Sequence, residues 1–165
     1  VCVMIRNILP FRRTKVTRRE MREHCFKMLF CTGFHPAEEA ALQIEQYFQS
    51  LEEDDVTPEG VTEIIHRVDL ATEDEEFLKE RVEAMILKTP ELDQKIDSIS
   101  EGWKTGRLGK VELTILRQAV YEMLFDDNVP QKVAINEAVD LAKKFGGSDA
   151  SAFTNGVLAK LVTVE

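Results

Sequence analysis

The chain has 165 residues and a mass of 18.8 kDa, with 44% hydrophobic residues, 31% charged residues and a net charge of −9. This length and composition fit one compact domain, and they exclude a mainly disordered chain, a collagen-like fibre and a multidomain enzyme with a separate cofactor module. No apolar run approaches the roughly 20 residues of a membrane span, and three cysteines without CxxC spacing favour a cytoplasmic chain over a secreted disulfide framework.

The first 15 residues differ from the rest of the sequence. They combine a short apolar stretch with Pro10 and a basic run, and they lack the basic start, longer apolar region and cleavage site of a signal peptide. A helix is predicted after them, because Thr17 and Glu20 have the spacing of a capping box and Gly33 can end the helix. We therefore expect residues 1–15 to be a non-native or disordered extension and residues 16–165 to form a helical domain.

Amphipathic helices are predicted through the middle of the chain, because apolar residues recur there at helical spacing. The expected segments are 36–56, 57–68, 72–86 and 89–102. Thr57-Pro58 and Thr89-Pro90 each resemble an N-cap followed by proline at the first helical position. Thr72 to Glu75 has the pattern of a second capping box.

The C-terminal half predicts three further helices. The most apolar one covers 111–125, the next extends from Val133 to the glycine pair at 146–147, and the last begins at Ser148 or Asp149. No segment alternates between apolar and polar residues with a period of two. The pattern therefore predicts an all-α fold of about seven helices, arranged as two small bundles over roughly residues 16–72 and 73–165.

The sequence contains no recognisable catalytic or metal-binding motif: GxSxG, HExxH and a P-loop are all absent. Cys25 and Cys31, with His24 and His35 nearby, lie six residues apart and should point to different faces of a helix. This spacing favours apolar core cysteines over metal ligands. We therefore expect no catalytic residue, no metal and no cofactor.

The charge is distributed unevenly along the chain. Residues 1–35 carry a net charge of +6 and residues 36–100 a net charge of −14, and seven cations fall between Arg12 and Lys27. Arginine binds phosphate through two hydrogen bonds and stacks on bases, so the basic stretch is compatible with an RNA partner as well as with a non-specific basic arm. The acidic middle is compatible with a basic protein partner or with a solvated surface.

Three blocks of the C-terminal half resemble the NusB transcription antitermination family. They are LGKVELTILRQAVYEM from Leu108, VPQKVAINEAVDLAKKFG from Val129 and FTNGVL from Phe153, and the segment Arg18–Phe30 resembles the arginine-rich first helix of that family. The resemblance implies a fold of two three-helix bundles without catalytic activity. It also implies binding to boxA-type single-stranded RNA of ribosomal RNA leaders, a heterodimer with the ribosomal protein NusE, and an indirect link to the RNA polymerase elongation complex.

The resemblance also assigns roles to individual residues. The implied RNA contacts are Arg18, Arg19, Arg22, Phe30, Asp149 and Phe153. Glu112 matches an acidic position that faces NusE, and helical spacing adds Glu122 and Asp126 to an acidic stripe for the same partner. Tyr121 is expected in a helix interface, Asn136 as a buried hydrogen-bonding side chain, and Gly156 where two helices approach closely.

Two function classes remain open at this level. One is an RNA-binding factor that regulates bacterial ribosomal RNA transcription together with NusE. The other is a stand-alone NusB-like RNA-binding or adaptor domain, related to the N-terminal domain of some rRNA methyltransferases. The sequence leaves no room for a cofactor-binding α/β module, and this favours the first class.

Overall fold

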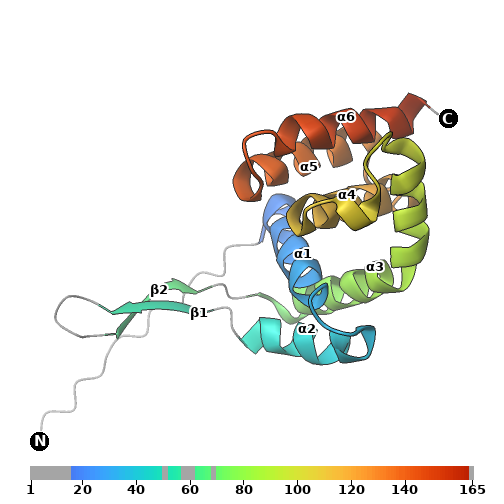
Figure 1. Ribbon diagram of the computed structural model, residues 1–165. Helices are drawn as coiled ribbons and strands as arrows, with labels where there is room; N and C mark the ends of the chain where they lie inside the picture. Colours follow the sequence, from blue (N-terminus) through green and yellow to red (C-terminus); the bar gives the residue numbers. More distant parts are fainter. Residues whose placement is uncertain (1–15, 50–51, 57–61, 68–69, 164–165) are drawn as a thin grey trace, which may run out of the picture.

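The computed structural model describes residues 16–49, 52–56, 62–67 and 70–163, and the expectation for residues 1–15 lies outside them. Helices dominate the described residues, so the predicted helical class is confirmed (Figure 1). In chain order the elements are α1 (Arg18–Thr32), the 3₁₀ turn η1 (Ala37–Glu39), α2 (Ala40–Gln49), β1 (Glu52–Val56), β2 (Thr62–Arg67), α3 (Thr72–Ile99), the 3₁₀ turn η2 (Thr105–Arg107), α4 (Lys110–Phe125), α5 (Gln131–Phe145) and α6 (Ala150–Thr163). Among these helices, none combines the length and the apolar character needed to cross a membrane.

Two clusters of buried apolar side chains hold the helices together. One joins α1, α2 and the first half of α3 around Ile44 and Leu78, and the other joins the second half of α3 with α4, α5 and α6 around Leu116 and Leu158. Helix α1 belongs to both clusters, because its Phe26 is buried in the second one. Figure 1 shows α5 and α6 stacked over α4, with α2 and the first half of α3 on the opposite side of the molecule. Tyr121 packs against both clusters, which confirms its expected place in a helix interface.

Helix α3 is longer and starts differently than the sequence patterns indicate. Ala71 is its N-cap and makes no side-chain capping bond, so the capping box expected at Thr72 is wrong. The helix continues through Pro90, so the separate helix expected at Thr89-Pro90 is also wrong. Pro90 has no backbone N–H, so one hydrogen bond of the helix is missing there. In the same turn, the hydroxyl of the preceding residue, Thr89, donates to the carbonyl of Met85 (3.1 Å). Figure 1 shows that α3 changes direction between its two halves.

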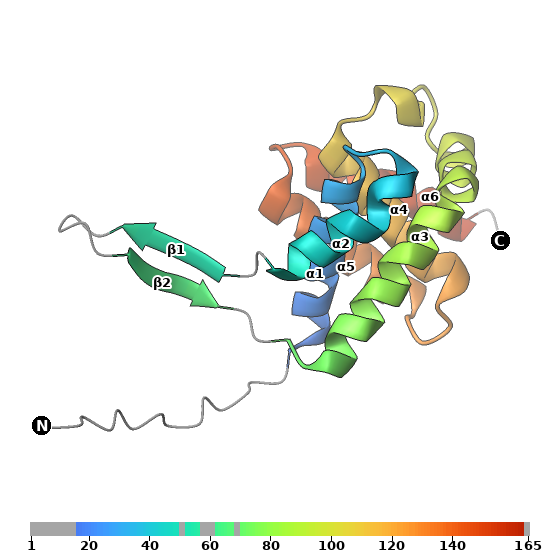
Figure 2. The same cartoon turned by 90° about the horizontal axis from the view of Figure 1, so that it is seen from below.

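Two antiparallel strands, β1 and β2, form where helices were expected over residues 36–56 and 57–68, and residues 57–61 and 68 lie outside the described part of the chain. Glu52 pairs with Arg67 and Glu53 with His66, and the register shifts before Asp54 pairs with Ile64. The β-branched residues of TEIIHR favour a strand, which explains why β2 forms in place of a helix. The hairpin extends away from the helices (Figure 2), and the expected cap at Thr57-Pro58 lies outside the described residues. Helix α2 accordingly ends at Gln49, earlier than expected.

Three further expectations about packing are wrong. Asn136 is exposed on α5, although a buried side chain was expected. A Cβ atom added to Gly156 would meet no atom within 4 Å, so this glycine is not required for close helix approach. Cys25 is buried as predicted, but Cys31 is exposed.

The same substitution at two positions of α3 tests the described packing. Leu92 is fully buried and Leu87 is 82% exposed. We expect Leu92→Ala to lower the free energy of unfolding by about 2–5 kcal/mol, because it leaves a cavity, and Leu87→Ala to change it by less than about 0.5 kcal/mol. Urea unfolding followed by circular dichroism measures both values. Equal losses for the two variants would contradict the assigned orientation of α3.

Candidate functional site

The start of α1 is fixed by the capping box that the sequence predicted. The backbone N–H of Glu20 donates to the Thr17 hydroxyl (3.2 Å), and the Glu20 carboxylate accepts from the Thr17 backbone N–H (2.7 Å). These hydrogen bonds with the backbone and side chain of Thr17 lower the pKa of Glu20 below its ordinary value. The cap defines where the helix begins, and it therefore defines the directions in which Arg18 and Arg19 project.

The three arginines of this helix have three different environments. Arg18 is exposed and forms no ion pair within the part of the chain that the structure describes. Arg19 is also exposed, and its guanidinium donates to Asp140 (2.6 Å) and Glu137 (3.5 Å) of α5. Hydrogen bonding to Glu137 and the nearby carboxylate charges raise the pKa of Arg19. Arg22, in contrast, is largely buried, so the expectation of three arginines on one exposed surface is wrong for this residue.

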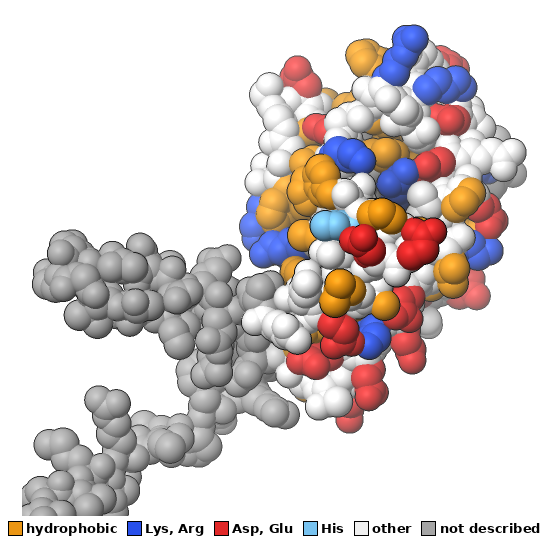
Figure 3. Space-filling view, turned by 60° about the horizontal axis from the view of Figure 1, so that its bottom comes forward, with side chains coloured by type: hydrophobic (Ala, Val, Ile, Leu, Met, Phe, Trp, Pro, Cys, Tyr) orange, Lys and Arg blue, Asp and Glu red, His pale blue; other side chains and the backbone are white. Residues whose placement is uncertain are grey.

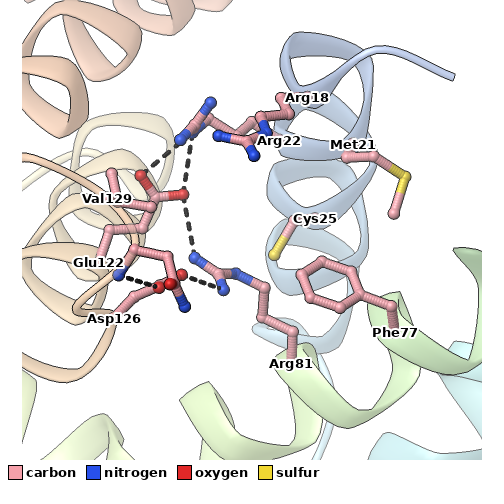
Figure 4. A pocket seen from close by; sticks show the side chains of 10 residues that line it. Arg18, Met21, Arg22, Cys25, Phe77, Arg81, Glu122, Asp126 and Val129 are labelled. Atoms are coloured by element: carbon pink, nitrogen blue, oxygen red, sulfur yellow. Dashed lines mark hydrogen bonds and ion pairs between the residues drawn. The ribbon is translucent and has the colours of Figure 1, made fainter.

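The guanidinium of Arg22 belongs to a buried ion-pair network (Figure 4). Its Nε lies 3.0 and 3.1 Å from the two carboxylate oxygens of Glu122, and Arg81 Nη2 donates to Glu122 Oε1 at 3.2 Å. Arg81 Nη1 donates to Asp126 at 2.7 Å. Two guanidinium groups thus meet two carboxylates, and the network connects α1, α3 and α4.

The acidic stripe expected on α4 therefore does not form. Glu122 is only 2% exposed, and Asp126 is held by Arg81. Burial tends to raise the pKa of Asp126, but hydrogen bonds from Arg81 and Asn128 outweigh this effect and leave the pKa below its ordinary value. The predicted docking of a partner on Glu122 is wrong for this conformation, because the carboxylate faces the interior of the protein.

The network lies at the base of a cavity of about 320 Å³ between α1, α3 and the α4–α5 loop. Figure 4 shows Met21, Cys25 and Phe77 around the same space. Burial raises the pKa of the Cys25 thiol to about 12. This thiol is therefore protonated near neutral pH and is not a reactive nucleophile.

Glu112, the remaining acidic residue of the expected stripe, lies in the first turn of α4. Its carboxylate folds back over the N-cap Gly109, where a Cβ atom would collide with it. A negative charge is favourable at this end of a helix because the helix dipole is positive there. The role of Glu112 in partner binding stays a prediction.

Aromatic residues cover the other end of α1. Phe30 is half-buried and lies between Phe26 (5.9 Å between ring centroids) and Phe34 (5.0 Å). Phe34 is 58% exposed, and the Lys110 ammonium lies 5.3 Å from its ring centroid. Phe34 was not identified from the sequence, because it follows Gly33 and belongs to no helical pattern.

Asp149 and Phe153 lie at the start of α6, as the resemblance implied. Asp149 is exposed, and its carbonyl accepts from the Phe153 backbone N–H (3.0 Å). The half-buried ring of Phe153 meets Trp103 edge-on, with 6.4 Å between the ring centroids. Trp103 is 57% exposed, and no pattern in the sequence indicated a role for it.

Helices α1 and α5 place the residues that were predicted to contact RNA along one band. From the start of α1 onward, Arg19 contacts Asp140, Glu23 contacts Lys144 (2.6 Å) and Phe26 stacks on Phe145 (4.8 Å). The contacts advance along both helices, so α1 and α5 run in the same direction, and α6 begins near the aromatic end of α1. Arg19 and Phe30 are separated by eleven residues, or roughly 16 Å along the helix. The predicted RNA residues therefore form a band with a basic end and an aromatic end, and Arg22 is not part of its exposed surface.

Helix α3 differs in charge from this band. Helix α3 carries nine acidic residues against four basic ones. In the view of Figure 3, acidic side chains are most dense toward the bottom of the face. Such a surface attracts basic partners and repels a polyanion.

Comparisons with known proteins give one consistent result. The NusB family matches residues 19–163. The chain is 45% identical over 147 residues to the transcription antitermination protein NusB of Lachnoclostridium phytofermentans, covering 89% of this chain and 99% of that protein. The NusB of Agathobacter rectalis is also 45% identical, over 88% of this chain and 98% of its own length.

Solved structures have the same fold. NusB of T. maritima superposes with a TM-score of 0.72 at 26% identity, covering 91% of this chain and 93% of that chain. A chain from the crystal structure of antitermination factors NusB and NusE in complex with dsRNA has a TM-score of 0.65 at 22% identity, covering 90% of this chain and 97% of that chain.

Removal of the charge of Glu122 tests the network. We expect Glu122→Gln to lower the free energy of unfolding by about 3–5 kcal/mol, because two largely buried guanidinium groups lose their shared carboxylate. The matched control is Glu101→Gln, at a residue whose side chain is 89% exposed, and it should change stability by less than about 0.5 kcal/mol. Thermal and urea unfolding measure both variants. A Glu122→Gln variant as stable as the control would show that the network does not hold the three helices together.

Proposed function

The chain belongs to the NusB family, and from this premise we propose that it is an RNA-binding transcription antitermination factor. In this proposal it binds boxA-type single-stranded RNA of ribosomal RNA leaders together with the ribosomal protein NusE. It acts in the cytoplasm of a bacterium and reaches the RNA polymerase elongation complex indirectly, through that assembly. It is a binding protein and not an enzyme.

The band along α1 and α5 is the observation that carries this proposal. Arg18 and Arg19 present two guanidinium groups at the capped start of α1, where phosphate oxygens can accept charge-assisted hydrogen bonds. Phe30 and Phe153 lie toward the other end, where unstacked bases can meet aromatic rings. Single-stranded RNA offers both phosphates and free bases, and so it fits a surface of this composition.

The relatives support the antitermination factor over the stand-alone domain of another protein. This chain covers 99% and 98% of the two NusB proteins compared above, so those relatives consist of this domain and little else. The crystal structure of antitermination factors NusB and NusE in complex with dsRNA, compared above, contains both proteins of the proposed assembly, whereas its RNA is double-stranded and the RNA proposed here is single-stranded. The acidic α3 supplies a surface that suits a basic ribosomal protein.

The exposed arginines give the first test of RNA binding. We expect the double variant Arg18→Ala/Arg19→Ala to bind boxA-type RNA more weakly, and to lower the slope of log K against log salt by roughly 0.7 for each lost phosphate contact. Arg22 is left intact, because its replacement would disturb the buried network. Fluorescence anisotropy across a salt series measures both quantities.

Two controls sharpen this test. Lys79→Ala/Lys88→Ala removes two partly exposed cations from α3 and should leave RNA affinity nearly unchanged. Asp140→Asn removes the carboxylate that competes with phosphate for Arg19, so it should strengthen RNA binding. Equal affinity of the arginine double variant and the parent would reject the basic end of the band as an RNA site.

Glu112 gives a separate test of the partner surface. We expect Glu112→Lys to weaken binding to NusE, mainly through slower association and an altered salt dependence, because a charge is reversed at the interface. RNA binding by the free protein should remain, since Glu112 lies on α4 and outside the band. Stopped-flow association at low salt measures the effect where screening is weakest. Glu38→Lys, at an exposed position of the 3₁₀ turn η1 and outside both α3 and α4, is the matched charge reversal, and equal association rates for the two variants would remove Glu112 from the interface.

A further inference from the structure

Trp103 presents a large aromatic ring to solvent at the end of α3. It is the single tryptophan of the chain, and 57% of its surface is exposed. Tryptophan combines a large apolar surface with low conformational freedom, and an exposed ring of this kind is suited to contact with a ligand.

The loop that carries Trp103 is held in place by several hydrogen bonds. The hydroxyl of Ser100 lies within hydrogen-bond distance of the carbonyls of Ile96 (2.8 Å) and Trp103 (2.6 Å), and the Trp103 backbone N–H donates to Ser100 (3.3 Å). Gly102 has a φ of 80°, a conformation that favours glycine. Asp97 accepts from the Thr105 backbone N–H (2.7 Å). The backbone on both sides of the ring is therefore fixed before any ligand binds, which lowers the entropic cost of binding.

The surroundings of the ring combine an aromatic neighbour with positive charge. Phe153 meets Trp103 edge-on, with an angle of 77° between the ring planes. Lys104 and Arg107 follow in the same loop and are both exposed, and residues 101–110 hold three cations against one acidic residue. The Lys104 ammonium contacts only a backbone carbonyl, that of Asp97 (3.2 Å), among the described residues, and Arg107 has no carboxylate partner there.

We propose that Trp103 is a stacking platform for one unpaired base of the RNA, with Phe153 against its edge and with Lys104 and Arg107 next to the flanking phosphates. This inference rests on the proposed RNA-binding function and extends it to a residue outside the arginine helix. Positive charge beside an aromatic ring is the combination found in grooves that bind single-stranded nucleic acid, and Lys104 in particular favours RNA over a protein ligand because the centres of protein interfaces are depleted of lysine. Stacking on one aromatic side chain is worth roughly five- to 150-fold in affinity.

Fluorescence excited at the long-wavelength edge of tryptophan absorption, where the two tyrosines do not absorb, reports on this ring alone, because no second tryptophan is present. A titration of the full chain with boxA-type single-stranded RNA should quench the emission of Trp103. The same RNA carrying an abasic nucleotide at each position in turn should lose this quenching at one position and keep it at the others.

Variants of Trp103 separate stacking from simple apolar contact. Trp103→Leu should weaken RNA binding by about fivefold or more, whereas Trp103→Phe should retain most of the affinity because it keeps an aromatic face. The salt slope should stay at the parent value, since no phosphate contact is removed. Phe125→Ala removes another exposed aromatic ring at the opposite end of α4 and should bind as the parent does. Circular dichroism melting curves confirm that each variant is folded.

The outcomes distinguish this inference from the function on which it rests. Failure of the parent protein to bind the RNA would reject the proposed function itself. Binding by the parent with unchanged affinity in Trp103→Leu, and without quenching, would overturn only the stacking site. A Trp103→Leu variant that binds RNA normally but NusE weakly would also overturn it, and would identify the ring as a protein contact.

Discussion

The carboxylate of Glu122 connects three helices through two guanidinium groups, and the position of α1 depends on this contact. Burial of an ionised carboxylate is costly unless it is paired and hydrogen-bonded, and here Arg22 and Arg81 both donate to it. Asp126 pairs with the second guanidinium, and Glu137 Oε2 lies 4.0 Å from Arg22 Nη1, so carboxylates neutralise both arginines. The orientation of α1 that results directs Arg18 and Arg19 toward solvent. The buried network and the proposed RNA surface are thus two sides of one helix.

The same helix shows why similar residues take different roles. Arg18 and Arg22 are only about 40° apart around the helix axis, yet one is exposed and the other is largely buried. They differ in their position along the axis, because Arg22 lies one turn further into the protein, where α4 covers it. Helical periodicity defines the direction of a side chain, but it does not define how far a neighbouring helix extends. The sequence could therefore predict the arginine helix and not the burial of Arg22.

Local signals in the sequence predicted the start of α1 and the extent of α4 correctly, and the capping box at Thr72 incorrectly. The capping box at Thr17 forms because both of its partners lie within one turn, and the apolar α4 appears where its periodicity placed it. Other predictions were wrong where contacts between residues far apart in the sequence determine the structure. Helix α3 passes through Pro90 because Leu92 and Ile96 are buried in the second cluster, and that packing outweighs the lost backbone bond. Trp103 was missed for a related reason, since its pairing with Phe153 joins residues that lie 50 positions apart.

The two ends of the proposed RNA band should contribute to binding in different ways. At the basic end, phosphate must compete with Asp140 and Glu137 for Arg19, so part of the attraction is offset by the lost internal ion pair. This contribution is electrostatic, and it falls as the salt concentration rises. At the aromatic end, contact between Trp103 and a base displaces no internal ion pair and depends little on salt.

Sequence preference is a separate matter from attraction. Phosphates are the same in every RNA, whereas bases are not, and so the basic end can attract RNA without distinguishing one RNA sequence from another. Preference for one RNA sequence over another requires contacts to the bases, and hydrogen bonds to their edges from polar groups such as Asp149 beside the aromatic rings, or from a partner protein, can supply it, because stacking alone tolerates every base.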